Sequence, residues 1–233
     1  MRQHEVLQEE QRIMDQVVIL AGGHGSRMKA AIPKPMLEVL GVPMLGWVVQ
    51  ACEAADLRNI CVVTGYKSQF IEHYLNNKYK TVLQAERLGT GHAVMQAVPV
   101  LEKNPDGNTL VLCGDAPFMD SETIQQAYQL HTAQGNAVTV ITAKLDNPFG
   151  YGRILRSETG IAAIVEEKDA TDAQRQIQEV NSGAYWFRTA DLLTLLKGLS
   201  QSNVQGEYYL TDTIGLALEQ GKKAGAYLTD NTD

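Results

Sequence analysis

The sequence predicts an α/β protein with a mostly parallel sheet, helices on both faces of it, and an antiparallel extension. Short apolar runs alternate with stretches of helical spacing up to about residue 149. The apolar runs are continuous, which is typical of parallel strands buried on both faces. From about residue 150 the strand-like runs follow one another, separated only by polar stretches, which favours antiparallel pairing.

Individual elements follow from these patterns. In the first half, strands are expected at 17–20, 60–65, 81–84, 109–113 and 137–143, and helices at 43–55, 71–75, 92–101 and 121–131. Pro99 is expected to kink or end the third of these helices. Ligands of such sheets bind at the carboxyl ends of the strands, which places residues 22–27, 84–91 and Asp115 on one rim.

The second half is predicted to have strands at 152–155, 161–167 and 180–187, a polar stretch at 169–178 and a helix at 210–220. Residues 1–16 are polar and are interpreted as an extension without assigned function. Residues 17–233 are expected to form one domain, with one half at about 17–149 and the other at about 150–233.

Composition excludes several function classes. The 233 residues carry a net charge of −7 without a basic block, which argues against nucleic-acid binding. Three cysteines form no CxxC pair, so a reducing cytoplasm is expected. No apolar run is long enough to span a bilayer, and the N-terminus lacks the apolar core of a signal peptide, so no membrane association is expected. A homo-oligomer is left open.

A glycine-rich loop follows the first strand. Glycines at 22, 23 and 25 let backbone amides approach a phosphate, and Arg27 and Lys34 add positive charge. The loop lacks the Gly-Lys-Ser/Thr of a P-loop, and Met28 stands where a dinucleotide or kinase loop needs its last glycine. Phosphate binding is therefore favoured over a plain tight turn.

Other candidates are less distinctive by themselves. Asp115 follows an apolar strand, where a carboxylate can bind a ligand, cap a helix or form a turn; Pro117 and the rim position favour the ligand. Without its neighbours, Gln84 is interpreted as a polar residue at the end of a strand. His92 is expected to face the loop or cap a helix, because no metal-ligand cluster surrounds it.

Taken together, the motifs resemble those of nucleotide-sugar pyrophosphorylases. Leu-Ala-Gly-Gly-x-Gly-Ser-Arg-Met, with Pro-Lys-Pro-Met-Leu after it, is the superfamily signature. The later segments resemble the uridyltransferase domain of bifunctional N-acetylglucosamine-1-phosphate uridyltransferase/glucosamine-1-phosphate acetyltransferases, and they lie at 84–93, 114–117, 150–154, 166–171, 178–183 and 205–212.

The resemblance implies a Rossmann-like fold with a sugar-binding extension, and a role for each matching residue. Arg27 and Lys34 would contact the phosphates, and Asp115 would bind Mg²⁺; these three are the expected catalytic residues. The expected substrate-binding residues are Leu20, Ala21, Gly22, Gly23, Gly25, Cys113 and Gly114 for the nucleotide, Gln84, Gly89 and Thr90 for uracil, and Gly152, Glu166 and Asn181 for the sugar.

The activity implied is transfer of a uridylyl group from UTP to N-acetylglucosamine-1-phosphate, giving UDP-N-acetylglucosamine and pyrophosphate, for cell-wall and peptidoglycan precursor synthesis. Family members also place an asparagine on the metal after the last helix; the sequence ends at Asp233 before such a segment, so Asp115 is the expected protein ligand. The acetyltransferase half is also missing, so acetyl transfer is not expected. Arg87 stands where an uncharged glutamine is expected.

Three alternatives remain open at this point. The enzyme could use another hexose-1-phosphate or another base. The chain could be a non-catalytic nucleotide-sugar binding module, or a structural α/β domain that binds neither ligand.

Overall fold

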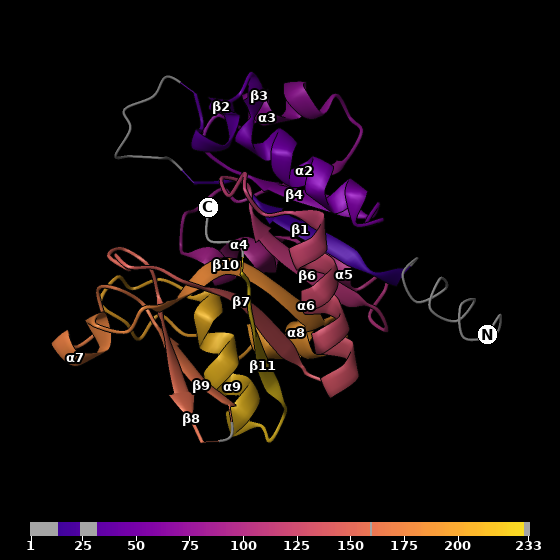
Figure 1. The fold of residues 1–233 in the computed structure, drawn as a ribbon. Helices are drawn as coiled ribbons and strands as arrows, with labels where there is room; N and C mark the ends of the chain where they lie inside the picture. The colour runs from indigo at the N-terminus through magenta and orange to yellow at the C-terminus, as the bar shows by residue number, and fades with distance from the viewer. Residues whose placement is uncertain (1–13, 24–31, 159, 231–233) are drawn as a thin grey trace.

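The structure is a computed structural model that describes residues 14–23, 32–158 and 160–230. Its described strands form a nine-stranded sheet in the order β11-β7-β10-β6-β1-β4-β5, and β8 joins the sheet through β10 and carries β9 (Figure 1). The strands are β1 (Gln16–Leu20), β4 (Ile60–Thr64), β5 (Lys80–Leu83), β6 (Asn108–Cys113), β7 (Val138–Lys144), β8 (Arg153–Ser157), β9 (Gly160–Val165), β10 (Glu179–Arg188) and β11 (Ala224–Leu228).

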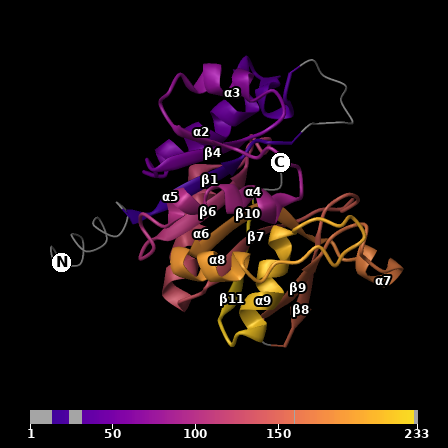
Figure 2. The same cartoon turned by 180° about the vertical axis from the view of Figure 1, so that it is seen from behind.

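Helices cover both faces of this sheet, as the sequence predicts (Figures 1 and 2). One face carries α2 (Met44–Ala54), α3 (Ser68–Leu75) and α6 (Ser121–Gln134). The other carries α4 (Thr90–Gln96), α5 (Val98–Leu101), α8 (Thr189–Leu196) and α9 (Thr213–Glu219). Shorter elements are η2 (Lys34–Met36), β2 (Glu38–Val39), β3 (Val42–Pro43), α7 (Asp172–Arg175) and η3 (Leu210–Asp212).

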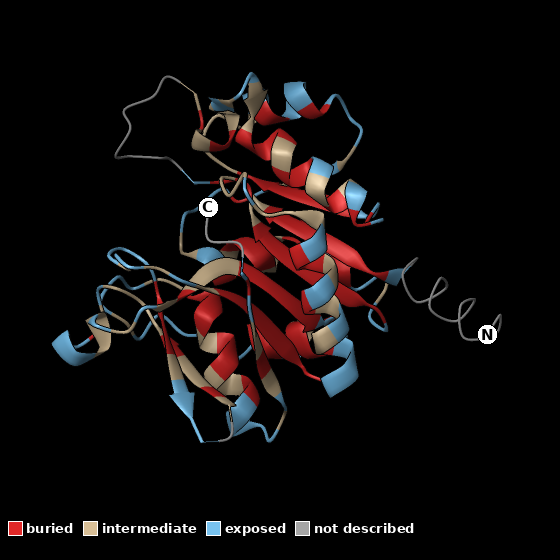
Figure 3. Cartoon of the chain, in the orientation of Figure 1, coloured by how far each residue is buried: buried red, intermediate tan, exposed pale blue. Residues whose placement is uncertain are grey.

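The core consists of two apolar layers separated by the sheet. Along β1, Val17 and Ile19 point into the layer under α2 and α6, whereas Val18 points into the layer under α4 and α8. All three are fully buried, and Figure 3 shows the central strands as the most buried part of the chain. Burial on both faces explains why these strands read as continuous apolar runs.

The sheet differs from the prediction at one point. The segment at 137–143 was expected to continue the parallel series, but β10 enters between β6 and β7 and pairs antiparallel with both. The second half therefore contributes a central strand as well as the antiparallel β8–β9 pair. Trp186 and Phe187 of β10 point into opposite layers, so this strand is needed to complete the core.

Two predicted helices are divided. The helix expected at 92–101 is interrupted at Ala97, because Pro99 cannot donate a helical hydrogen bond, and α5 continues beyond it. The helix expected at 210–220 begins as η3 and continues as α9. The elements that had not been predicted are α7, α8 and β11 and the short elements η2, β2 and β3.

The N-terminal extension expected at 1–16 lies mostly outside the described residues, but Asp15 and Gln16 pack with the sheet. Gln16 lies in β1, and the Asp15 carboxylate accepts a hydrogen bond of 2.8 Å from the Asn108 amide. Asp15 and Gln16 are both buried, so they belong to the domain. None of the helices in the described ranges combines the length and the apolar character required to cross a membrane.

Candidate active site

Four parallel strands end at the same rim of the sheet. Leu20, the last residue of β1, lies opposite Val63 of β4 and Cys113 of β6, and Thr64 lies opposite Leu83 of β5. The glycine loop, the Gln84 segment and the Gly114–Asp115 turn therefore leave the sheet at one level. This is the edge at which parallel α/β sheets bind their ligands.

The glycine loop packs directly on the neighbouring backbone. A Cβ added to Gly65 would lie 2.7 Å from the Gly22 carbonyl oxygen, and one added to Gly22 would lie 3.0 Å from Gln84 Oε1. Ala21 N donates to Val63 O, and Gly114 N donates to Leu20 O. The start of the loop, Leu20 to Gly22, is thus fixed by three neighbouring strands. Gly23 is exposed, and Gly25 and Arg27 lie outside the described residues.

Lys34 and Asp115 form an ion pair at the strand-end rim of the sheet. Lys34 Nζ lies 2.7 Å from Asp115 Oδ2, and the two side chains are 39% and 34% exposed. Lys34 opens η2 and is flanked by Pro33 and Pro35, whose fixed φ angles limit the directions in which it can point. An ion pair this exposed contributes little stability, so an incoming ligand can open it at small cost.

A cavity of about 680 Å³ adjoins this pair. It lies between the strand-end rim and residues of β7 and β10. Its lining residues are Lys34, Val39, Met44, Cys113, Asp115, Ala116, Pro117, Phe118, Met119, Thr123, Ala143, Leu145, Tyr151, Val180, Ser182 and Thr229. Tyr151 and Phe118 are exposed aromatic residues of this lining.

The residues expected to read the base form a separate group beside the glycine loop. Gln84 is buried, and its Nε2 donates to the Gly89 carbonyl oxygen over 3.1 Å. Gly89 has a φ of +105°, and a Cβ there would lie 2.5 Å from Tyr208 O. Only glycine fits this position.

The 208–210 segment clamps this loop from outside. Tyr208 N donates to Leu88 O, and Gly91 N donates to Tyr208 O. Leu210 N donates to the Thr90 hydroxyl over 3.0 Å. The segment at 205–212, which sequence reasoning quoted without a role, therefore supports the loop that contains Gly89 and Thr90.

The three residues expected to hold the sugar also lie together. A Cβ added to Gly152 would lie 3.5 Å from Glu166 Oε2 and 3.6 Å from Asn181 Cβ. Thr211 donates to Glu166 Oε1 over 3.2 Å, and burial raises the pKa of Glu166. Thr211 belongs to the segment at 205–212, and no individual role was predicted for it.

Cys113 connects the rim to the sugar group. Its Sγ lies 2.9 Å from the position that a Gly183 Cβ would occupy, and Gly183 N donates to Asn181 Oδ1 over 2.8 Å. Burial raises the pKa of the Cys113 thiol to about 12, so this cysteine is an unreactive packing group. Burial also raises the pKa of Tyr185 well above its ordinary value.

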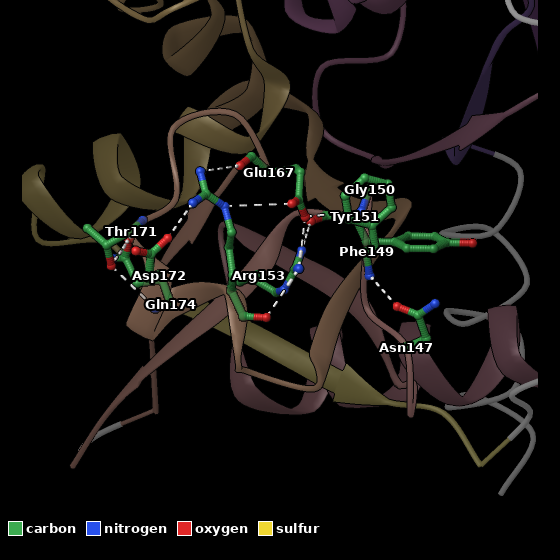
Figure 4. A network of polar contacts seen from close by, with 10 residues as sticks. Asn147, Phe149, Gly150, Tyr151, Arg153, Glu167, Thr171, Asp172 and Gln174 are labelled. Atoms are coloured by element: carbon green, nitrogen blue, oxygen red, sulfur yellow. Dashed lines mark hydrogen bonds and ion pairs between the residues drawn. The ribbon is translucent and has the colours of Figure 1, made fainter.

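A buried arginine braces the backbone beside the sugar group (Figure 4). Arg153 is 1% exposed; its guanidinium donates to Tyr151 O and lies 2.8 Å from Glu167 Oε2. The same Glu167 oxygen accepts from Gly150 N over 3.0 Å. These contacts involve the residues on either side of Gly152 in sequence and tie them to the segment after β9 that carries Glu166 and Glu167.

The structure thus brings the predicted residues together in three groups rather than in one cavity. Lys34, Cys113 and Asp115 line the cavity, whereas none of the residues expected to contact uracil or the sugar is among its lining residues. The lining residues that had not been predicted carry apolar, aromatic or hydroxyl side chains, and some of them, including Met119 and Thr229, lie outside every motif segment.

Comparisons with known proteins agree with this architecture. Residues 16–232 match the family model described as nucleotidyl transferase. The chain is 45% identical over 217 residues to a protein of Streptococcus gordonii named bifunctional protein GlmU, and 42% identical to one of Streptococcus suis with the same name. These matches cover 93% of this chain and 47% of each relative, so the chain spans about half the length of the curated relatives it matches.

A solved structure supports the fold independently. A putative glucose-1-phosphate thymidylyltransferase from Bacillus anthracis, solved in complex with a sucrose, superposes with a TM-score of 0.78 and 21% identity, over 93% of this chain and 87% of its own. With the family model matching nearly the whole chain, this protein belongs to the nucleotidyl transferase family.

Proposed function

We propose that this chain transfers a uridylyl group from UTP to N-acetylglucosamine-1-phosphate and releases pyrophosphate. The observation that carries the proposal is the Lys34–Asp115 pair, 2.7 Å apart at the mouth of a 680 Å³ cavity on the strand-end rim. The names of the streptococcal relatives, at 42–45% identity, support the choice of substrates.

The chemistry needs positioning and charge neutralisation rather than a strong base. An oxygen of the sugar phosphate attacks the α-phosphorus of UTP, the bond from that phosphorus to the bridging oxygen breaks, and pyrophosphate leaves with the electron pair. The attacking oxygen is already ionised at neutral pH, so no proton has to be removed. The residues then have to overcome repulsion between anions.

Each group of residues has a distinct part in this proposal. Lys34, together with Arg27, would neutralise charge on the phosphates. The backbone of Leu20 to Gly22 would surround the nucleotide, and Gln84 with Gly89 and Thr90 would contact uracil. Gly152, Glu166 and Asn181 would hold the sugar through a backbone group, a carboxylate and an amide.

A magnesium ion fits the donor set at the rim. In the described part of the chain no group of three or more acidic, cysteine or histidine side chains could hold a metal alone. Mg²⁺ in nucleotide sites is bound through one or two carboxylates together with phosphates and waters, so Asp115 could hold an ion that arrives with the nucleotide. When bound, the ion would neutralise charge on the phosphates.

A substrate panel tests the proposal. Pyrophosphate release is measured with UTP, CTP, dTTP or ATP, each combined with N-acetylglucosamine-1-phosphate, glucose-1-phosphate or glucosamine-1-phosphate. We expect the largest kcat/KM for UTP with the N-acetylated sugar. A larger value for another pair would reassign the substrates, and no turnover with any pair would remove the enzymatic assignment.

A further inference from the structure

Lys34 and Asp115 are each other's sole ion-pair partner within the described part of the chain. Lys34 Nζ lies 2.7 Å from Asp115 Oδ2, and among residues 14–23, 32–158 and 160–230 neither side chain forms a further ion pair or side-chain hydrogen bond. Asp115 is also the only carboxylate among the residues that line the cavity of about 680 Å³. The ammonium of Lys34 therefore neutralises the one negative side chain of that lining.

The backbone on both sides of this pair is held by hydrogen bonds. Lys34 begins η2, and its carbonyl oxygen accepts from Leu37 N over 3.0 Å. Asp115 comes directly after Gly114, whose N donates to Leu20 O over 2.9 Å. A Cβ added to Gly114 would lie 3.2 Å from that same oxygen, so the turn packs closely on the end of β1. The contact between the lysine and the carboxylate is therefore a feature of the fold.

A divalent ion on Asp115 and the ammonium of Lys34 compete for the same carboxylate. The ammonium already lies at hydrogen-bond distance from one carboxylate oxygen, so an ion on the other oxygen would be close to this positive charge. Like charges at such short range repel each other. The two side chains are 39% and 34% exposed, so water screens the interaction. An exposed pair of this kind changes a binding constant by at most about fivefold.

A polyphosphate would relieve this competition. Its oxygens can accept from an ammonium and bind a divalent ion at the same time, so Lys34 can leave Asp115 for a phosphate while the carboxylate stays with the ion. The negative charge of the phosphates also offsets the repulsion between the two cations. By thermodynamic linkage, a polyphosphate that draws Lys34 away raises the affinity of Asp115 for the ion.

We propose that Lys34 is an internal cation that keeps divalent ions off Asp115 until a polyphosphate binds, so that the ion enters with the nucleotide and not before it. The inference rests on the proposed function, because it takes Asp115 as the carboxylate that holds the ion. It gives Lys34 a role in addition to its contact with the phosphates, and it explains why the lysine contacts the carboxylate.

A small set of variants isolates the positive charge of Lys34. Lys34→Met keeps the length of the side chain and removes the charge, whereas Lys34→Arg keeps the charge. Lys103→Met makes the same change in net charge at an exposed site before the start of β6, whereas Asp115 follows the end of that strand. The double variant Lys34→Met/Asp115→Asn also removes the carboxylate. Thermal unfolding checks that each protein is folded, and Lys34→Gln serves as a second uncharged variant.

The readout is the Kd for Mn²⁺ bound to the protein alone, measured from the electron paramagnetic resonance signal of free Mn²⁺. This ion takes the same oxygen ligands as Mg²⁺. We expect Lys34→Met to bind Mn²⁺ about fivefold more tightly than the wild type, and Lys34→Arg and Lys103→Met to bind it as weakly as the wild type. The double variant should lose the gain. When the metal is supplied as its UTP complex, Lys34→Met should bind it no more tightly than the wild type, because the lysine then contacts phosphate.

Equal Mn²⁺ affinities of Lys34→Met and the wild type would overturn the inference, as would a gain that persists in the double variant. A gain of the same size for the UTP complex would also overturn it, because Lys34 would then remain on Asp115 when the nucleotide binds. The expected affinities without pyrophosphate release from any substrate pair would reject only the proposed activity. The two failures are therefore distinguishable.

Discussion

Glu166 shows how burial affects the charge of a single residue that is proposed to bind the sugar. The side chain accepts one hydrogen bond from Thr211, and burial raises its pKa. The charged form is therefore disfavoured in the folded protein, and the native stability associated with this group falls as the pH rises from its ordinary pKa through the raised pKa of the folded state. Such a carboxylate gains more than an exposed one from a ligand that donates hydrogen bonds to it.

Glu166→Gln tests this view of the sugar group. The amide keeps the shape but removes the buried charge, so we expect a free energy of unfolding at neutral pH that is no lower than that of the wild type. The KM for the sugar phosphate should rise about tenfold, because a hydrogen bond to a charged acceptor is lost. Steady-state kinetics and urea titration measure both quantities; an unchanged KM would remove Glu166 from the sugar contacts.

At the residue scale, the sequence predicted those site residues that belong to recognisable motifs. Asp115 was expected on the rim and Lys34 at the phosphates of the same ligand, and their side chains form an ion pair. Arg153 could not be predicted in the same way. An arginine at the start of a strand normally reads as exposed, and only the fold reveals that it is fully buried against Glu167.

The β8 strand contains two arginines in contrasting settings. Arg153, at its start, is buried and contacts Glu167, Tyr151 O and Arg175 O. Arg156, three residues later, is 43% exposed and pairs with Glu179. The planar fork of Arg153 serves several acceptors at once, which a lysine cannot do. Arg156 is therefore a matched control for Arg153 within the same strand.

We expect Arg153→Lys to raise the KM for the sugar phosphate several-fold while the KM for UTP changes less than about twofold, because Gly152 loses its support and the glycine loop does not. Arg156→Lys should leave both constants unchanged, since exposed pairs contribute little. Initial rates with each substrate varied in turn provide the measurement. Equal effects of the two substitutions on sugar KM would argue against a positioning role for Arg153.

Elements were predictable where local pattern and burial agree. Three of the four parallel strands at the rim, β1, β4 and β6, are buried and largely apolar runs. Asp120 caps α6 by accepting from Thr123 N over 2.7 Å. β11 was missed because Ala224, Gly225 and Ala226 carry little strand signal. β10 was predicted as a strand, but its place between β6 and β7 depends on long-range pairing that no local pattern contains.

At the scale of the whole molecule, one buried histidine links stability to pH. His131 of α6 is 1% exposed and lies 2.9 Å from the Thr139 hydroxyl of β7. Burial lowers its pKa to about 4 from the ordinary 6.5. The folded protein therefore keeps this ring neutral at a pH at which the unfolded chain binds a proton, so stability is lost as the pH falls from about 6.5 toward 4.

His131→Asn removes the titrating ring and keeps a polar partner for Thr139. We expect the wild type to lose up to about 3 kcal/mol more stability than the variant between pH 7 and pH 4, the amount that corresponds to the shift in pKa. Urea unfolding at a series of pH values measures the difference. Parallel stability curves for the two proteins would show that His131 does not titrate in this range.

The central claim for the molecule is that Asp115 acts on a polyphosphate bound at the rim. The direct test is the rate of pyrophosphate release from UTP and N-acetylglucosamine-1-phosphate, with and without Mg²⁺, in the wild type, in Asp115→Asn and in Asp106→Asn, an exposed site just before β6. We predict a magnesium-dependent rate that falls about a hundredfold or more in Asp115→Asn and is unchanged in Asp106→Asn. A wild-type rate in Asp115→Asn would contradict the account.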